Sequence, residues 1–171
     1  KLGALRKAFP DTPFLALTAT ADKQTRKDIS ARLHLNKPEW FISSFDRPNI
    51  TYRVTLRSDG FGKLVDFLQH RPNDAGIVYC LSRKSVENTA AKLNANGFSA
   101  LPYHAGLSKE NRQENQEKFI KDEVKIIVAT IAFGMGIDKS NVRFVVHTNM
   151  PQNIESYYQE TGRAGRDGLP G

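Results

Sequence analysis

The sequence predicts an α/β fold in which a parallel sheet is flanked by helices. Four short apolar segments, at residues 13–17, 76–80, 125–129 and 142–147, are rich in Val, Ile and Phe and have the length of buried strands. Stretches with helical spacing separate them along the chain. Because parallel strands need a crossover connection, usually a helix, this alternation favours a parallel sheet covered on both faces. Ligands of such sheets bind beyond the carboxyl ends of the strands, where most of the chemically notable residues are expected.

The first helices are predicted from apolar spacing and from capping residues. Residues 23–33 have a helical pattern, and Asp22 just before them is a candidate N-cap. Two further helices are indicated by Leu64, Val65, Phe67 and Leu68 and then by Val86, Ala90 and Leu93. Gly97 stands where the second of these should end, since glycine readily takes the left-handed conformation that closes helices.

Two more helices are expected in the second half of the chain, after a short strand around residues 99–101. Ser108 is a candidate N-cap for a polar helix that continues to about Lys121. The last helix begins near Ile154. We expect Ile154, Tyr157 and Tyr158 to form its buried side.

Composition narrows the class of protein. The chain has 171 residues, of which 39% are hydrophobic, and a formal net charge of +7, which favours a polyanionic partner. No apolar run approaches the roughly 20 residues that a membrane-spanning helix needs, and the first residues lack the apolar core of a signal peptide. Cys80 is the single cysteine, so an internal disulfide or a cysteine-built zinc site is excluded within this sequence. We expect Cys80 to be a buried, inert thiol and the protein to be intracellular.

The chain is predicted to contain parts of two domains. Residues 1–44 form the first part, residues 45–52 a polar, proline-containing join, and residues 53–171 the second domain. The sequence lacks an initiating Met and ends at Leu169-Pro170-Gly171, so both ends are expected to continue in a longer protein.

The most informative segment is YYQETGRAGRDG, at residues 157–168. Gln159, Gly162, Arg163 and Arg166 are spaced i, i+3, i+4 and i+7, which predicts that they line one face of a helix. Arginine presents a planar fork of donors that matches phosphate oxygens. A solvated basic helix end, favoured by the helix dipole, is the alternative interpretation.

This segment resembles motif VI of superfamily 2 helicases, Q-x-x-G-R-x-x-R, and the longer string is similar to that of the RecQ-family DNA helicases. The resemblance implies that Arg166 acts as an arginine finger on a nucleotide held by another domain. It gives Arg163 a supporting phosphate role and Gln159 a coupling role. Arginine fingers contribute about 10³- to 10⁵-fold in rate.

Three other segments match the same family. The string ALTATA at residues 16–21 resembles motif III, which implies a coupling role for Thr18 and Thr20, and SSFDRPNI at residues 43–50 resembles the interdomain connection. The string IVYCLSR resembles motif IV, which implies that Ser82 and Arg83 contact a nucleic-acid backbone. Without the resemblance, a helix cap at Asp22 explains the first segment equally well, and Ser82 is better explained as a residue that starts a turn or caps a helix.

Two further loops carry candidate ligand contacts. His104 lies in YHAGL, which the family places near the DNA path, although a single histidine is more often a structural hydrogen-bonding residue. The segment 129–139 resembles motif V, which implies that Thr130 lies beside DNA and that Gly136 and Asp138 lie beside ATP. An ordinary turn is the alternative for this Gly-x-Gly segment, and many family members have Asn where Asp138 stands.

The resemblance spans essentially the whole chain and implies part of an ATP-dependent 3′-to-5′ DNA helicase of RecQ type with RecA-like domains. Its ligands would be ATP with Mg²⁺, bound mainly by the first RecA-like domain of the same protein, and single-stranded or partly duplex DNA. Zinc is possible in a downstream region outside this sequence, and no metal ligands are expected within it. No phosphate-binding loop of the form G-x-x-x-x-G-K-[ST] occurs here, so the chain alone should not hydrolyse ATP. A superfamily 2 RNA helicase and a non-catalytic nucleic-acid-binding module remain the alternatives.

Overall fold

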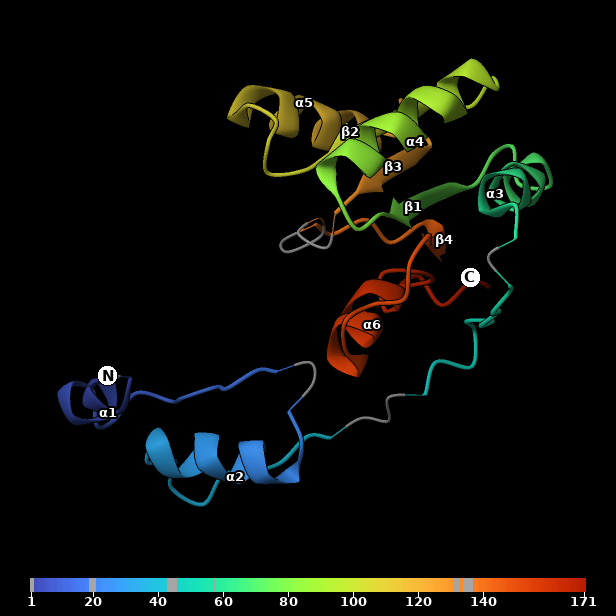
Figure 1. The fold of residues 1–171 in the computed structure, drawn as a ribbon. Helices are drawn as coiled ribbons and strands as arrows, with labels where there is room; N and C mark the ends of the chain where they lie inside the picture. Colours follow the sequence, from blue (N-terminus) through green and yellow to red (C-terminus); the bar gives the residue numbers. More distant parts are fainter. Residues whose placement is uncertain (1, 19–20, 43–45, 57, 131–132, 134–136) are drawn as a thin grey trace. The chain divides into compact units, whose positions relative to one another are not determined.

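The computed structural model describes residues 2–18, 21–42, 46–56, 58–130, 133 and 137–171. The chain forms two compact units, residues 1–46 and 47–171, with the boundary between Asp46 and Arg47 (Figure 1). This boundary falls inside the stretch predicted as the interdomain join.

The first unit contains two helices, α1 (Gly3–Ala8) and α2 (Lys23–Arg32). The predicted cap of α2 is confirmed, because the Asp22 carboxylate accepts a hydrogen bond of 2.7 Å from the Thr25 amide. The strand predicted at residues 13–17 is wrong: this stretch belongs to none of the strands, and Leu15 and Leu17 are 80% and 84% exposed. A strand needs a neighbour for its backbone groups, and all four strands among the described residues belong to the second unit.

The second unit confirms the predicted parallel sheet. Its strands are β1 (Ala75–Tyr79), β2 (Ala100–Tyr103), β3 (Ile126–Ala129) and β4 (Val142–His147), arranged in the order β2-β3-β1-β4. Every neighbouring pair is parallel. The carboxyl ends of all four strands therefore meet at one edge of the sheet.

Helices cover both faces of this sheet, as Figure 1 shows. The side chains of α3 (Gly60–Gln69) and α4 (Arg83–Ala95) pack with Val78, Val128 and Phe144 in one apolar core. On the opposite face, Phe119 of α5 (Lys109–Ile120) packs with Ile77 and Ile127 in a second core. Neighbouring residues of β1 and β3 thus alternate between the two cores, which explains why these strands are continuously apolar.

The local capping predictions for this unit are also confirmed. Ser108 caps α5, with its hydroxyl accepting a 3.1 Å hydrogen bond from the Asn111 amide. Gly97 follows α4 with a φ of +84°. Cys80 is a buried free thiol, 4% exposed in the first of the two cores.

The predicted buried side of α6 (Ile154–Thr161) is wrong for Ile154 and Tyr158 and right for Tyr157, which is half-buried. Ile154 and Tyr158 are 62% and 42% exposed, whereas the polar residues Glu160 and Thr161 are buried. The inward side is therefore formed by Tyr157, Glu160 and Thr161, which are also spaced i, i+3 and i+4.

Candidate functional site

The carboxyl edge of the sheet gathers most of the side chains that the sequence singled out. Ser82 follows β1, His104 follows β2 and Thr130 follows β3, and the loop after α6 joins them from the end of the chain. This arrangement follows from the parallel pairing, because each crossover helix returns the chain to the opposite edge.

Arg166 and Asp138, from two separate predicted motifs, lie together at this edge. The Arg166 Nη1 is 3.7 Å from the Asp138 Oδ1 and donates a 3.2 Å hydrogen bond to the Ile137 carbonyl. The Asp138 side chain is 97% exposed and that of Arg166 is 36% exposed. An ion pair this exposed contributes little to stability, so both groups remain accessible to a ligand.

The predicted helical face of Gln159, Gly162, Arg163 and Arg166 is wrong. Helix α6 ends at Thr161 with Gly162 as its C-cap, so exposed Gln159 lies on the helix and the two arginines lie in the turns that follow. Gly165 has a φ of +57°, which no helix continues through. Its amide instead donates a 2.8 Å hydrogen bond to the Val142 carbonyl, which holds the loop against the sheet.

Arg163 belongs to a buried polar cluster beneath this loop. The His147 Nε2 and the Glu160 Oε2 are 2.6 Å apart, and the His147 ring stacks on Tyr79. Burial raises the pKa of Tyr79 to about 12, while the charge of Arg163 and its hydrogen bond act in the opposite direction. The Tyr79 hydroxyl donates a 3.0 Å hydrogen bond to the Phe133 carbonyl. Our sequence analysis missed Glu160 and His147. Glu160 could have been found from the helical spacing of Tyr157, Glu160 and Thr161, which places it on the inward side of α6.

The residues after β1 and β3 that the sequence predicted as nucleic-acid contacts differ in exposure and in hydrogen bonding. The Ser82 hydroxyl caps α4 by accepting a 3.1 Å hydrogen bond from the Ser85 amide. Arg83 is exposed in the first turn of α4 and lies over the loop at Gly106, where an added Cβ would be 3.1 Å from its Cδ. Thr130 is half-buried, and its amide donates a 3.3 Å hydrogen bond to the Tyr103 carbonyl. Of these residues, Arg83 has the charge and exposure suited to a phosphate.

His104 has the geometry of a structural residue. Its side chain is 3% exposed, and its Nδ1 accepts a 3.1 Å hydrogen bond from the Gly106 amide. The proton therefore lies on Nε2, which is 3.1 Å from the Glu87 Oε1. This burial and hydrogen bonding agree with the alternative of a structural histidine, and the expected place of His104 near DNA stays a prediction.

The remaining predicted residues are outside this cluster or outside the described residues. Thr18 is exposed, in the stretch of the first unit that precedes α2. Thr20 and Gly136 lie outside the described residues. Within the part of the chain that the structure describes, no group of three or more His, Cys, Asp or Glu side chains is arranged to hold a metal ion.

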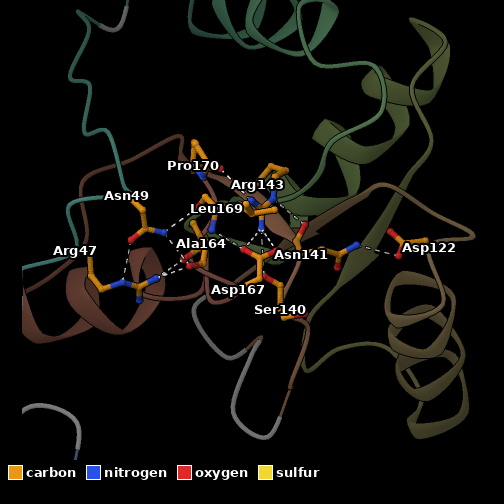
Figure 2. Close-up of polar contacts among 11 residues, drawn as sticks. Arg47, Asn49, Asp122, Ser140, Asn141, Arg143, Ala164, Asp167, Leu169 and Pro170 are labelled. Carbon is orange, nitrogen blue, oxygen red and sulfur yellow. Dashed lines mark hydrogen bonds and ion pairs between the residues drawn. The ribbon is translucent and has the colours of Figure 1, made fainter.

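Two residues that the sequence analysis treated only as part of the join contact the Arg166 loop directly (Figure 2). The Arg47 Nη2 donates hydrogen bonds of 3.1 Å and 2.7 Å to the carbonyls of Ala164 and Gly165. The Asn49 Nδ2 donates 2.9 Å hydrogen bonds to the carbonyls of Gly165 and Leu169. We call this pair, Arg47 and Asn49, the loop clamp.

A second anchor holds the other side of the loop. The Arg143 Nη2 lies 2.6 Å from both carboxylate oxygens of Asp167 (Figure 2). The Arg143 hydrogen bond is the main cause that lowers the pKa of Asp167. Arg143 also donates a 3.0 Å hydrogen bond to the Pro170 carbonyl. Arg166 therefore lies between two anchored neighbours.

Comparisons with known proteins agree with this fold. Residues 59–168 match the family model of the helicase conserved C-terminal domain. An ATP-dependent DNA helicase RecQ from Pasteurella multocida is 53% identical over 99% of this chain and 27% of its own length. The RecQ-like DNA helicase BLM of Xenopus laevis is 48% identical over 98% of this chain and 13% of that protein.

Solved structures show the same architecture. S. cerevisiae Dbp5 bound to RNA and ADP BeF3 has a TM-score of 0.72 at 19% identity, covering 90% of this chain and 42% of that one. A DEAD box protein from Methanococcus jannaschii has a TM-score of 0.59 at 32% identity, covering 65% of this chain and 30% of that one.

The family model covers more than half of the sequence, so the chain belongs to the helicase conserved C-terminal domain family, and its sequence is of the RecQ type within superfamily 2. The predicted fold class and the family resemblance are thereby confirmed. The chain spans about a quarter of the length of the bacterial relatives, at 27% and 28%. None of the helices in the described residues is long and apolar enough to cross a membrane.

Proposed function

We propose that this chain supplies the arginine finger and half of the ATP and single-stranded DNA sites of an ATP-dependent 3′-to-5′ DNA helicase. The observation that carries the proposal is the placement of Arg166 beside Asp138 at the carboxyl edge of the parallel sheet. The curated relatives named above are called DNA helicases, which favours DNA over RNA as the polymer.

The side chains at this edge fit a nucleotide chemically. Arg166 offers an accessible guanidinium for phosphate oxygens, and Asp138 offers an exposed carboxylate that can accept a ribose hydroxyl. In this proposal Gly136 is a further nucleotide contact, and Arg163 supports the phosphates. Exposed Gln159, one turn before the loop, couples the nucleotide to the rest of the motor. Bound ATP with Mg²⁺ would supply the phosphoryl group whose developing charge a finger stabilises.

The proposed DNA contacts lie at the same edge of the sheet. Arg83 is the principal candidate because it is charged and exposed, and Ser82 and Thr130 lie at the ends of adjacent strands. The net charge of +7 favours sequence-independent binding to phosphates. His104 is left with a supporting role, because its buried ring orients the loop at Gly106 beside Arg83.

The first RecA-like domain would provide the rest of the ATP site. The phosphate-binding loop is not in this sequence, so this chain alone is expected to be inactive. Residues 1–44 would be the end of that domain, and Thr18 and Thr20 would couple the nucleotide to DNA. The join at residues 45–52 would connect it to the domain at residues 53–171.

The decisive experiment measures ATP hydrolysis by the full-length protein with saturating single-stranded DNA. Arg166→Ala should lower kcat at least about 10²-fold, near the lower reach of finger effects. Binding of ATP and DNA should change far less, because a finger acts mainly on the transition state. Arg166→Lys should restore little, since a point charge does not reproduce the planar fork.

The control is Arg53→Ala, which removes the same charge from an exposed residue of the same unit. Near-normal turnover in Arg166→Ala, with at most a loss of about 0.3–1 kcal/mol in stability, would mean that Arg166 only caps the end of α6. Single-stranded RNA that stimulates hydrolysis better than DNA would favour the RNA helicase alternative. A full-length protein that binds DNA but hydrolyses no ATP would favour the non-catalytic module.

A further inference from the structure

The loop that carries Arg166 is held by residues more than a hundred positions earlier in the sequence. Arg47 and Asn49 together donate four hydrogen bonds to its carbonyl groups, at distances from 2.7 to 3.1 Å. The two residues are also joined to each other, because the Arg47 Nε donates a 3.4 Å hydrogen bond to the Asn49 Oδ1. The clamp is therefore a connected network.

The loop after α6 presents backbone carbonyl groups to a charged donor. Helix α6 ends at Thr161, so the carbonyls of Ala164 and Gly165 lie in the turns that follow and take no part in helix hydrogen bonds. The Gly165 carbonyl accepts a 3.0 Å hydrogen bond from the Gly168 amide. The Arg47 guanidinium supplies a charged donor to both carbonyls, those of Ala164 and Gly165.

The contact acts on the peptide bond that precedes Arg166. The Gly165 carbonyl accepts from Arg47 at 2.7 Å and from Asn49 at 2.9 Å. Because a peptide unit is planar, these donors, together with the Gly168 amide at 3.0 Å, restrict the orientation of the plane that contains the Arg166 amide. The direction in which the Arg166 side chain leaves the backbone depends on that plane and on the rotation about the Arg166 N–Cα bond.

The glycine in the loop gives independent support for a close fit. A Cβ on Gly165 would lie 2.4 Å from the Asn49 Nδ2 and 2.8 Å from the Leu169 carbonyl oxygen. Asn49 thus occupies the space that a side chain would need. The backbone adds to this contact, since the Gly171 amide donates to the Asn49 carbonyl at 2.9 Å and the Thr51 amide donates to the Gly171 carbonyl at 3.0 Å.

We propose that Arg47 and Asn49 are positioning residues for ATP hydrolysis, which hold the Arg166 loop in the geometry that the finger needs. The proposal rests on the function proposed for Arg166. Arg47 is the first residue of the second unit, so the clamp ties the segment that enters this unit to the loop that carries the finger. Holding the loop in this way should affect kcat, because the stabilisation of charge on the transferred phosphoryl group depends on where the Arg166 guanidinium lies.

The test uses the full-length protein and measures kcat and KM for ATP, affinity for single-stranded DNA and thermal stability. Arg47→Ala should lower kcat about 10-fold, equivalent to about 1.4 kcal/mol of transition-state stabilisation. This is less than the loss from Arg166→Ala, because a loosened loop still presents the guanidinium. KM for ATP and the affinity for DNA should stay within about twofold, because the substitution removes no contact with bound ATP or DNA.

A double-mutant cycle separates positioning from a general structural role. If Arg47 acts through Arg166, Arg47→Ala should cause no further loss of kcat in the Arg166→Ala background. Asn49→Ala removes two donors and keeps the charge, so it should lower kcat in the same direction by a smaller factor. It also keeps the proposal testable if Arg47→Ala does not fold. Arg53→Ala is the matched control, because Arg53 is exposed and forms no side-chain hydrogen bond with any described residue.

The outcomes distinguish the two proposals. Normal turnover in Arg47→Ala and Asn49→Ala, with turnover lost in Arg166→Ala, would overturn the clamp and leave the finger. An equal loss from Arg47→Ala with and without Arg166 would also overturn it, because the effect would then bypass the finger. Normal turnover in Arg166→Ala would overturn the finger first, and the clamp with it.

Discussion

The closeness of Asn49 to Gly165 leads to a prediction about stability that needs no ligand. Gly165 and Gly168 both have positive φ angles, +57° and +82°. An added Cβ on Gly165 would contact Asn49 and Leu169 at 2.4 and 2.8 Å, whereas on Gly168 it would have nothing within 4 Å. Replacing each with Ala therefore separates the cost of backbone conformation from the cost of displacing the clamp.

The two substitutions should differ by about 2 kcal/mol. A left-handed conformation costs an L-residue about 1–2 kcal/mol, and removing glycine from the unfolded chain returns about 0.4–1 kcal/mol. Gly168→Ala should therefore cost about 1 kcal/mol or less. Gly165→Ala must also displace Asn49, which loses two hydrogen bonds worth about 0.5–1.5 kcal/mol each. Its total cost should be about 3 kcal/mol.

Urea unfolding of this chain measures the difference. All five tyrosines lie between residues 52 and 158, in the second unit, so tyrosine fluorescence follows that unit while Trp40 follows the first. At a typical slope of about 1–3 kcal/mol per molar urea, the two midpoints should differ by about 1 M. Adding Asn49→Ala to Gly165→Ala should cost less than the sum of the two changes. Equal midpoints for Gly165→Ala and Gly168→Ala would refute the close fit of the clamp.

Three further predictions follow from charge and burial. Burial raises the pKa of Tyr79 from 10.0 to about 12, so its stabilising contribution, about 2–3 kcal/mol, should be present below about pH 10 and be lost as the pH rises to about 12. Urea midpoints measured across this range should fall less steeply in Tyr79→Phe, and parallel curves would contradict the shift. Affinity for single-stranded DNA should decrease with log salt by about 0.7 per phosphate contacted, and Arg83→Ala should make this slope shallower; a salt-independent affinity would argue against phosphate contacts. The chain alone should show no ATP hydrolysis, and turnover abolished by Arg166→Ala within this chain would contradict that expectation.

The sequence alone was sufficient to predict structural features that depend on a few neighbouring residues. The caps at Asp22 and Ser108 and the end of α4 at Gly97 depend on a few adjacent residues, and all three were predicted correctly. The parallel sheet was also predictable, because buried strands and intervening helices leave little choice of topology. The segment at 13–17 was misjudged for the opposite reason: a strand depends on neighbours that its own residues do not specify.

The candidate site was only partly predictable. The sequence identified Arg166 and Asp138, which the structure brings within 3.7 Å. It placed Arg166 on a helix because the spacing at 159–166 has the helical period, but glycine at 162 and 165 ends the helix first. Arg47 and Asn49 could not be found this way, since their partners are 116 to 120 residues away and are backbone carbonyls that any residue possesses.

The position of Arg166 in a loop has a physical advantage over a position on a helix. A helix directs its side chains rigidly but satisfies its own carbonyls, so little can adjust one side chain relative to the sheet. The turns after α6 leave carbonyls that Arg47 and Asn49 occupy on one side, while Arg143 binds Asp167 on the other. The peptide units around Arg166 are thus fixed from both directions, and its side chain keeps the exposure that a ligand contact requires. Held in this way, a guanidinium needs little reorganisation when charge develops, which is the condition for a large electrostatic effect on rate.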